Sequence, residues 1–482
     1  AQFPTAKVNT TKLAVTDTEV IVGQLHSATG TMAISETGSI QAEQLAIDQI
    51  NAMGGVLGRK IKVIKEDGAS DWPTFAEKSK KLIINDKVAC VFGCWTSASR
   101  KAVLPVFEKE NGLLYYPTFY EGLEQSKNVI YTGQEATQQI IWGLDWASKE
   151  KKAKTYFLIG SDYIWPRTSM KIARKHIENF QKGKVVGEEY YALGSTNFQS
   201  LINKIKVAKP DCIFAAVVGG SNVAFYKQLK AAGITGDKQF LLTLSVTEDE
   251  MLGVGGENFA GFFSSMKYFQ SLDNANNKKF VEAFKAKYGP KSVIGDVTQA
   301  GYLGPWLWKA AVEKAGSFDV DAVVKASPGI ELKTAPEGYV KVHENHHLWS
   351  KARIAQGLPD GDAHPARRRD EVVRILRLRF AEQPDDHRQG DGERQQRDAD
   401  ERLAPAMVLD QPGSEARQER RGDAGAHQCE REGEAAVVHE PRVHRTRPGD
   451  GRRAAAERAH EYPQQVEGEQ GGGREGERCE GD

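Results

Sequence analysis

Two neighbouring stretches of the chain, 91–101 and 113–122, each end an apolar run with hydroxyl and aromatic side chains. Hydroxyls donate and accept hydrogen bonds and aromatic faces exclude water, so together they suit a small, polar, planar molecule. The side chains that could contact it are Trp95, Thr96, Ser97, Tyr116 and Thr118. Thr96 and Ser97 also suit the first turn of a helix, whose free N–H groups attract polar ligands. Two ordinary strand-to-helix turns with capping residues would have the same composition.

The elements around these stretches alternate between strands and helices. Apolar strand-like runs at 19–25, 58–67 and 88–93 alternate with helical patterns at 40–51 and 71–85. This order with short connections is typical of a parallel, doubly wound sheet. In such a sheet, ligands bind at the carboxyl ends of the strands, which is where both stretches lie.

The alternation restarts near residue 155 and predicts a second lobe of the same design, with strands at 155–160, 184–191, 211–218 and 240–244. We therefore expect an α/β fold of two Rossmann-like lobes joined by a hinge. The expected divisions are 18–134 plus 262–340 for lobe 1 and 135–261 plus 341–356 for lobe 2. The polar residues 1–17 are expected to form a loose arm.

The composition changes abruptly near residue 356. Residues 1–356 contain 38 Lys and 5 Arg, whereas residues 357–482 contain no Lys and 22 Arg. The second segment has only two aromatic residues, so it cannot bury enough apolar area to fold and is predicted to be disordered. It is either a charged interaction tail or, as we favour, the product of a shifted reading frame in GC-rich DNA.

Several functional classes lack a supporting motif. The five cysteines, Cys90, Cys94, Cys212, Cys429 and Cys479, form no disulfide or zinc pattern. His343, His346 and His347 are interpreted as part of a turn, and no metal site or cofactor is predicted. No run is long enough for a membrane helix, and no basic-aromatic array indicates nucleic acid. Hydrolytic motifs are also absent, so we do not expect an enzyme.

Five segments carry a resemblance to a known family: Leu25–Ser35, Gly93–Val103, Tyr116–Gly122, Gly160–Arg167 and Glu344–His347. Through them, residues from about 18 to 350 resemble the type I periplasmic solute-binding proteins of the branched-chain amino-acid transporter class. Within that class they look most like the amide- and urea-binding branch, and more like urea transporter binding proteins than like cytoplasmic amide sensors.

The resemblance implies a ligand site in the cleft between the lobes. It places Ser97, Tyr116 and Thr118 on one wall, and Tyr163 and Trp165 on the other. Gly219 and Ser245, at two further strand ends, complete the candidate set. Trp95 and Phe119 replace a Tyr and a Pro of the amide sensor, which favours a smaller ligand. Glu121, Asp162 and Glu248 are candidate carboxylates, each expected to be a cap or a surface charge.

The expected function is therefore capture of urea, or of a short-chain amide, for the permease subunits of an ABC importer. Urea has four N–H donors and one carbonyl acceptor, which a closed site must pair. The chain begins at Ala1 rather than Met, which we interpret as an exported, periplasmic form without its signal peptide. The alternative is a cytoplasmic amide sensor that signals by lobe closure.

Overall fold

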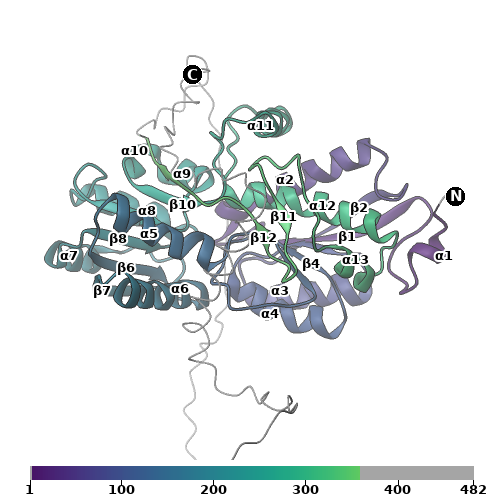
Figure 1. Ribbon diagram of the computed structural model, residues 1–482, viewed down its shortest axis with the longest axis horizontal. Helices are drawn as coiled ribbons and strands as arrows, with labels where there is room; N and C mark the ends of the chain where they lie inside the picture. Colours follow the sequence, from purple (N-terminus) through teal and green to yellow (C-terminus); the bar gives the residue numbers. More distant parts are fainter. Residues whose placement is uncertain (1–2, 359–482) are drawn as a thin grey trace, which may run out of the picture. The chain divides into compact units, whose positions relative to one another are not determined.

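The computed structural model describes residues 3–358, and the tail predicted after residue 356 lies almost entirely outside this range. Two sheets organise the described residues, with strand orders β2-β1-β3-β4-β5 and β13-β10-β9-β8-β6-β7 (Figure 1). The strands are β1 Glu19–His26, β2 Lys60–Asp67, β3 Val91–Gly93, β4 Leu114–Tyr116, β5 Val129–Tyr131, β6 Thr155–Ser161, β7 Lys184–Tyr191, β8 Cys212–Ala216, β9 Phe240–Thr243, β10 Phe263–Met266, β11 Lys341–Val342, β12 Leu348–Trp349 and β13 Arg353–Gln356. Within the two sheets, only the pairing of β13 with β10 is antiparallel.

Helices connect the strands as the alternating pattern predicts. They are α1 Thr5–Val8, α2 Ala33–Ala52, α3 Trp72–Lys80, α4 Ser97–Lys109, α5 Trp142–Glu150, α6 Ile164–Lys175, α7 Gln199–Ala208, α8 Ser221–Ala231, α9 Glu248–Val254, α10 Gly256–Phe259, α11 Ala275–Tyr288, α12 Asp296–Ala315 and α13 Val320–Ala326. Single π-helical turns adjoin α3, α5 and α6. None of the helices in residues 3–358 is long and apolar enough to cross a membrane.

Apolar side chains cover both faces of each sheet, as a doubly wound fold requires. In the second sheet every residue of β8 is buried, which explains why its sequence is apolar without alternation. Helices α7 and α8 pack on one face of this sheet, and α5 and α6 pack on the other. Cys90 and Cys212 are buried in these cores, as the sequence indicated.

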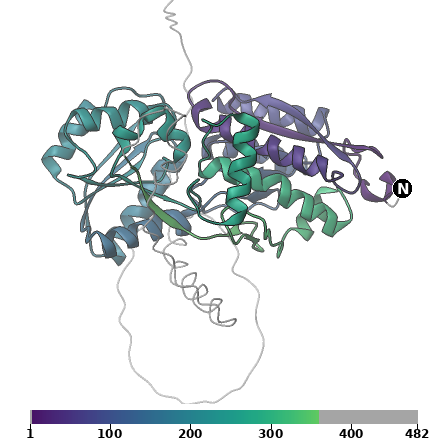
Figure 2. The ribbon, with the colours of Figure 1, turned by 90° about the horizontal axis from the view of Figure 1, so that it is seen from above.

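The chain passes between the sheets three times. It leaves the first sheet after β5, returns after β10, and crosses again to form β13. The green helices α12 and α13 lie with the purple N-terminal elements in Figures 1 and 2, and α12 packs along α2. A two-lobed α/β architecture with parallel sheets is thus confirmed.

Two lobe divisions differ from the sequence prediction. The segment from residue 262 was expected in lobe 1, whereas β10 pairs with β9 in the second sheet. Residues 341–349 were expected in lobe 2, whereas Val342 and Leu348 belong to the core of lobe 1 and His347 bridges to Tyr131 of β5. A local apolar pattern identifies a strand but not the sheet that it joins.

The prediction of a loose N-terminal arm is wrong for the described residues. Val8 and Val15 are buried in the core of lobe 1. Arg59 donates hydrogen bonds to the carbonyl groups of Phe3 and Thr16, and Phe318 donates one to Val8. The polar sequence of residues 1–17 gave no indication of these few anchoring contacts.

Candidate functional site

The start of α4 forms the first wall of the candidate site. Thr96 caps the helix, because its side-chain oxygen accepts hydrogen bonds from the N–H groups of Ala98 and Ser99. Ser99 completes a capping box by accepting from the N–H of Thr96 at 2.7 Å. This local chemistry fixes the helix start, so that Ser97 is the first helical residue, shortly after β3 ends at Gly93.

Ser97 belongs to a buried network of charged groups. Its hydroxyl donates to Glu121 Oε2 at 2.6 Å and accepts from Arg100 at 3.1 Å. Arg100 also donates to Glu121 Oε1 at 2.8 Å. All three side chains are nearly inaccessible to solvent, with Arg100 fully buried and Glu121 3% exposed. Glu121 is therefore neither a cap nor a surface charge, contrary to the expectation from sequence.

A second carboxylate and two aromatic rings hold Arg100 in place. Its Nε donates to Glu124 at 2.8 Å, and its guanidinium lies 4.4 Å from the ring centre of Tyr120 and 4.9 Å from that of Tyr116. Glu124 also accepts from the Tyr131 hydroxyl at 2.8 Å and pairs with Lys101. These partners lower the pKa of Glu124 although its burial raises it.

The Glu344–His347 motif supports this network through His347. His347 stacks on Tyr131, with ring centres 4.4 Å apart, and contacts the Tyr120 hydroxyl. Burial lowers the pKa of His347 to about 4, so the ring is neutral at physiological pH. The described residues contain no cluster of His, Cys, Asp or Glu that could hold a metal ion. The interpretation of these histidines as part of a turn is consistent with the turn over Glu344–His346.

Two tyrosines of the candidate site, Tyr116 and Tyr163, come from different lobes. Tyr116 ends β4 in the first sheet, and its buried hydroxyl has no hydrogen-bond partner. Tyr163 precedes α6 in the second lobe. Burial raises the pKa of Tyr163 far above its ordinary value, Tyr116 and Glu121 raise it further, and Arg100 lowers it. The Tyr163 ring packs against Trp165, which contacts Phe119 of the first lobe, so Tyr163 lies near the seam between the lobes.

Three aromatic side chains close the space beside these tyrosines. Phe119 packs edge-on against Trp95 of the first lobe, with ring centres 5.1 Å apart, and against Trp165 of the second lobe at 5.0 Å. The indole N–H of Trp95 donates to the Ser35 carbonyl, whereas that of Trp165 is buried without a partner. The structure therefore leaves one indole donor of this group unpaired.

The remaining candidates have different surroundings. Thr118 is buried and donates to the Cys94 carbonyl at 3.2 Å, which leaves its oxygen lone pairs available. Gly219 adopts a left-handed conformation, and a side chain there would meet Met32 and the Thr31 carbonyl of lobe 1. Ser245 donates to the Val217 carbonyl at 2.6 Å, so its contact is within the second sheet.

The sequence analysis missed two polar side chains at the start of α8. The Ser221 hydroxyl and both amide atoms of Asn222 are buried without partners. The preceding Gly220 donates its N–H to the Thr31 carbonyl of the first lobe at 3.3 Å, so α8 begins at the seam between the lobes. The run Gly219–Asn222 after a buried strand was a signal for this position, but it was interpreted only as a helix cap.

The other two candidate carboxylates lie elsewhere. Asp162 is exposed and pairs with Arg167 at 2.5 Å, as expected for a surface charge. Glu248 is buried at the start of α9, accepts from the N–H of Gln270, and leaves Oε2 unpaired. Burial raises its pKa to about 8, and the nearby Asp249 and Asp296 contribute.

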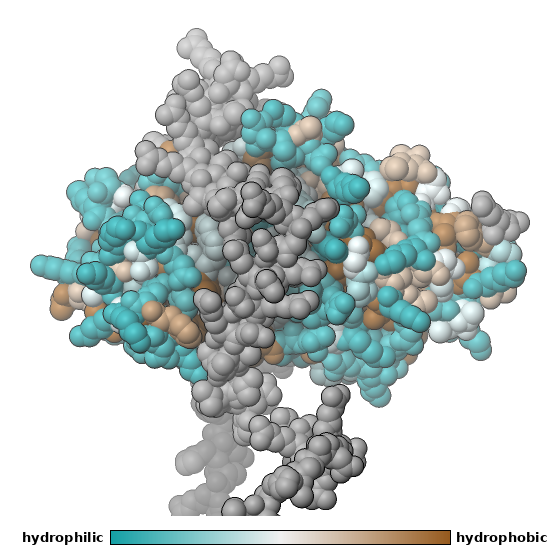
Figure 3. Space-filling view, viewed as in Figure 1, coloured by the Kyte–Doolittle hydropathy of each residue, from teal (hydrophilic) through white to brown (hydrophobic). Residues whose placement is uncertain are grey.

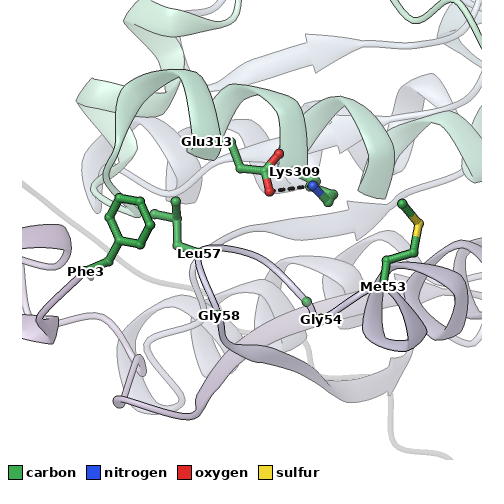
Figure 4. Close-up of a pocket in the computed structure, with 8 residues that line it drawn as sticks. Phe3, Met53, Gly54, Leu57, Gly58, Lys309 and Glu313 are labelled. Atoms are coloured by element: carbon green, nitrogen blue, oxygen red, sulfur yellow. Dashed lines mark hydrogen bonds and ion pairs between the residues drawn. The ribbon is translucent and has the colours of Figure 1, made fainter. Parts of the chain in front are cut away.

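A separate pocket of about 420 Å³ lies on lobe 1. It is lined by Phe3, Met53, Gly54, Gly55, Leu57, Gly58, Lys309 and Glu313 (Figure 4). Lys309 and Glu313 form an ion pair with each other at this pocket. Hydrophilic residues cover much of the visible described surface in Figure 3. No polar group that is both unpaired and buried points to a ligand in this pocket.

Comparison with known proteins finds a matching family and several similar sequences. The sequence model of the periplasmic binding protein domain matches residues 20–376. The Leu/Ile/Val-binding protein homolog 7 of Brucella suis is 24% identical over 378 residues, which cover 72% of this chain and 92% of that protein. A leucine-, isoleucine-, valine-, threonine- and alanine-binding protein of Pseudomonas aeruginosa is 26% identical over 63% of this chain and 80% of its own length.

Solved structures share the fold. A solute-binding protein of an ABC transporter from R. palustris, in complex with benzoate, has a TM-score of 0.63 and 23% identity, covering 71% of this chain and 94% of its own. A branched-chain amino acid transporter substrate-binding protein from Streptococcus pneumoniae, in complex with isoleucine, has a TM-score of 0.62 and 20% identity, covering 70% and 96%.

Proposed function

The chain belongs to the periplasmic binding protein domain family, and from that premise we propose that it captures urea or a short-chain amide for an ABC importer. Solute binding outside the cytoplasm is the role that the family implies. The finer assignment depends on the groups between the lobes, and the single observation that carries it is the set of hydrogen-bond acceptors around Ser97.

Three oxygen-bearing groups of the first wall can accept hydrogen bonds from a solute. Ser97 and Thr118 have already donated their hydroxyl protons, to Glu121 and to the Cys94 carbonyl. Glu121 is a carboxylate and accepts only. This set favours a solute rich in N–H donors, since a buried donor without a partner costs about 1–3 kcal/mol.

Two unpaired donors, one from each wall, can bind a carbonyl group. The Trp165 indole N–H is unpaired, and the Tyr116 hydroxyl is unpaired at the edge of the first wall. Packed rings of Trp95, Phe119 and Trp165 restrict the space, which favours a ligand smaller than an amino acid with a branched side chain. Urea and short amides have both features, several N–H donors and one carbonyl oxygen.

Calorimetric titration of the full chain with urea, acetamide, formamide and leucine tests this assignment. We expect saturable binding of urea or an amide and at least tenfold weaker binding of leucine. Tight binding of leucine with no heat from urea or the amides would contradict it and favour the ligands for which the relatives are named.

The permease partner and the exported location follow from the same proposal. A solute-binding protein of an ABC importer releases its ligand to membrane subunits, whereas the alternative, a cytoplasmic amide sensor, acts on a regulatory partner. The relatives named as binding proteins of ABC transporters support the first reading. Fractionation of cells that express the gene from its own start codon separates the two: recovery in the periplasmic fraction supports export.

A further inference from the structure

We infer that Glu121 is the specificity-determining residue of this site, accepting hydrogen bonds from the N–H groups of the solute, with Arg100 as its positioning residue. The inference deepens the proposed function and rests on the same cleft. It starts from the buried contacts of Ser97, Glu121 and Arg100, in which every donor direction is fixed.

Ser97 can only accept from a ligand while this network is intact. A hydroxyl has one proton and two lone pairs. The proton is directed to Glu121 Oε2 at 2.6 Å, and one lone pair accepts from Arg100 at 3.1 Å. One lone pair remains. A ligand carbonyl placed at Ser97 would face an oxygen with no proton to give.

Glu121, like Ser97, can only accept hydrogen bonds from a ligand, and its charge makes it the stronger acceptor. Each carboxylate oxygen can accept about two hydrogen bonds, and the protein supplies one to each: Ser97 to Oε2 and Arg100 to Oε1. Acceptor capacity therefore remains on both oxygens. Phe119, two residues before Glu121, contacts Trp165 of the second lobe with ring centres 5.0 Å apart, so Glu121 lies in the segment of lobe 1 that meets lobe 2. Hydrogen bonds to a charged acceptor are about twice as strong as neutral ones, so Glu121 contributes more than Ser97.

Arg100 fixes the orientation of both acceptors. It is fully buried and stacked near Tyr116 and Tyr120, so it has little freedom to follow a ligand. Its NH1 and NH2 groups contact Ser97 and Glu121 separately, which holds the two acceptors side by side. Arg100 keeps its positive charge at physiological pH, so proton loss does not disturb its hydrogen bonds to Ser97 and Glu121.

The inferred solute class is a neutral or cationic molecule with N–H groups directed at Glu121. Acetone, acetamide and urea have nearly the same planar shape and carry zero, one and two amino groups. Acetate has the shape of acetamide but places negative charge against a carboxylate. The series therefore separates N–H recognition from shape and from the hydrophobic contribution of the aromatic rings.

Glu124 offers a matched control. Like Glu121 it is a nearly buried carboxylate that accepts from Arg100 at 2.8 Å, but its other contacts are to Tyr131 and Lys101 rather than to Ser97. Glu121→Gln and Glu124→Gln each remove one negative charge next to Arg100. Both are expected to lower the melting temperature, so stability alone does not distinguish them.

Titration of the wild-type chain and both variants with acetone, acetamide, urea, acetate, leucine and benzoate tests the inference. In the wild type we expect affinity to rise from acetone to acetamide to urea. Glu121→Gln should lower urea affinity by about tenfold to a hundredfold, as expected for loss of a buried charged acceptor, and should flatten the series. Glu124→Gln should keep urea affinity within about threefold. If Glu121→Gln does not fold, Ser97→Ala provides the second variant and should also reduce the urea-to-acetone preference.

The outcomes separate this inference from the proposed function. If leucine binds in place of urea, and Glu121→Gln alone abolishes that binding, the proposed function fails while the inference stands, because the ammonium group of leucine is also an N–H donor. Equal losses in the Glu121 and Glu124 variants would overturn the inference even if urea binds. Binding of benzoate unaffected by Glu121→Gln, or no binding of any N–H-bearing solute, would overturn it as well.

Discussion

The two walls of the candidate site, one from each lobe, differ in how their polar groups are paired. On the first wall, Ser97, Glu121 and Arg100 are bonded to one another, and only the Tyr116 hydroxyl lacks a partner. On the second, Trp165, Ser221 and Asn222 are buried with unpaired polar atoms. Buried polar groups are nearly always paired. The acceptors of the first wall are therefore held in place by partners within the protein, whereas the second wall keeps several polar atoms without any partner. In the proposed site, the first lobe thus holds the acceptors in fixed positions.

The largest effect is expected when the positive charge of Arg100, which pairs with the carboxylates of the first wall, is removed. Arg100→Met leaves Glu121 as a buried carboxylate without its cation, and leaves Glu124 with Lys101 alone. Breaking a buried pair in this way is expected to reduce the free energy of unfolding by about 3–5 kcal/mol. Differential scanning calorimetry measures the loss. A reduction below about 1 kcal/mol would show that the first wall is not held by Arg100.

The second wall is tested through its tyrosine. Tyr163→Phe removes one hydroxyl from the cleft and is expected to weaken urea binding by about 1–3 kcal/mol if that hydroxyl pairs a ligand group. Tyr156→Phe is the control, because its hydroxyl contacts the Ala153 carbonyl and Gln181 inside lobe 2. Titration calorimetry should show a loss only for Tyr163→Phe. Unchanged affinity would remove Tyr163 from the group of residues that contact ligand.

Glu248 extends the comparison to the start of α9, where one carboxylate oxygen is also unpaired. Its pKa is raised from 4.5 to about 8, so the folded state holds a proton that the unfolded state releases above about pH 4.5. Stability therefore falls as pH rises from 4.5 to 8. Glu248→Gln should remove part of this slope and stabilise the protein by about 1 kcal/mol at pH 8, with little effect at pH 4. Equal effects at both pH values, measured by calorimetry, would contradict the raised pKa.

The smallest effect is expected at an exposed pair of the second lobe. Arg167 and Asp162 are each about half exposed and bonded at 2.5 Å. Solvent screens such pairs, so Arg167→Met should leave the melting temperature unchanged within error. A loss comparable to that of Arg100→Met would show that burial does not decide the difference between the two arginines.

The sequence predicted the fold better than it predicted the pairing of charged groups. Alternating strand and helix patterns were sufficient for a two-lobed α/β chain, because hydrophobic periodicity is local. The contact between Arg100 and Glu121 depends on the position of α4 relative to the loop after β4, which no local pattern records. The same limit explains why the Phe263–Met266 strand was anticipated while its sheet was not.

The candidate site shows a similar division. Ser97, Tyr116 and Tyr163 came from residue types at strand ends and from resemblance, and in the structure Tyr163 packs beside Trp165, which contacts Phe119 of the first lobe. Asn222 was missed because an Asn beside two glycines is common in turns, and only burial reveals that its amide lacks partners.

The central claim is that Ser97 and Glu121 accept the N–H groups of a urea-like solute while Trp165 or Tyr116 donates to its carbonyl oxygen. A crystal structure of the full chain with urea tests it most directly. The account predicts urea between the walls, with its nitrogen atoms about 3 Å from Glu121 and Ser97 and its oxygen directed toward Trp165 or Tyr116. Urea with its oxygen facing Glu121, or bound outside this cleft, would contradict it.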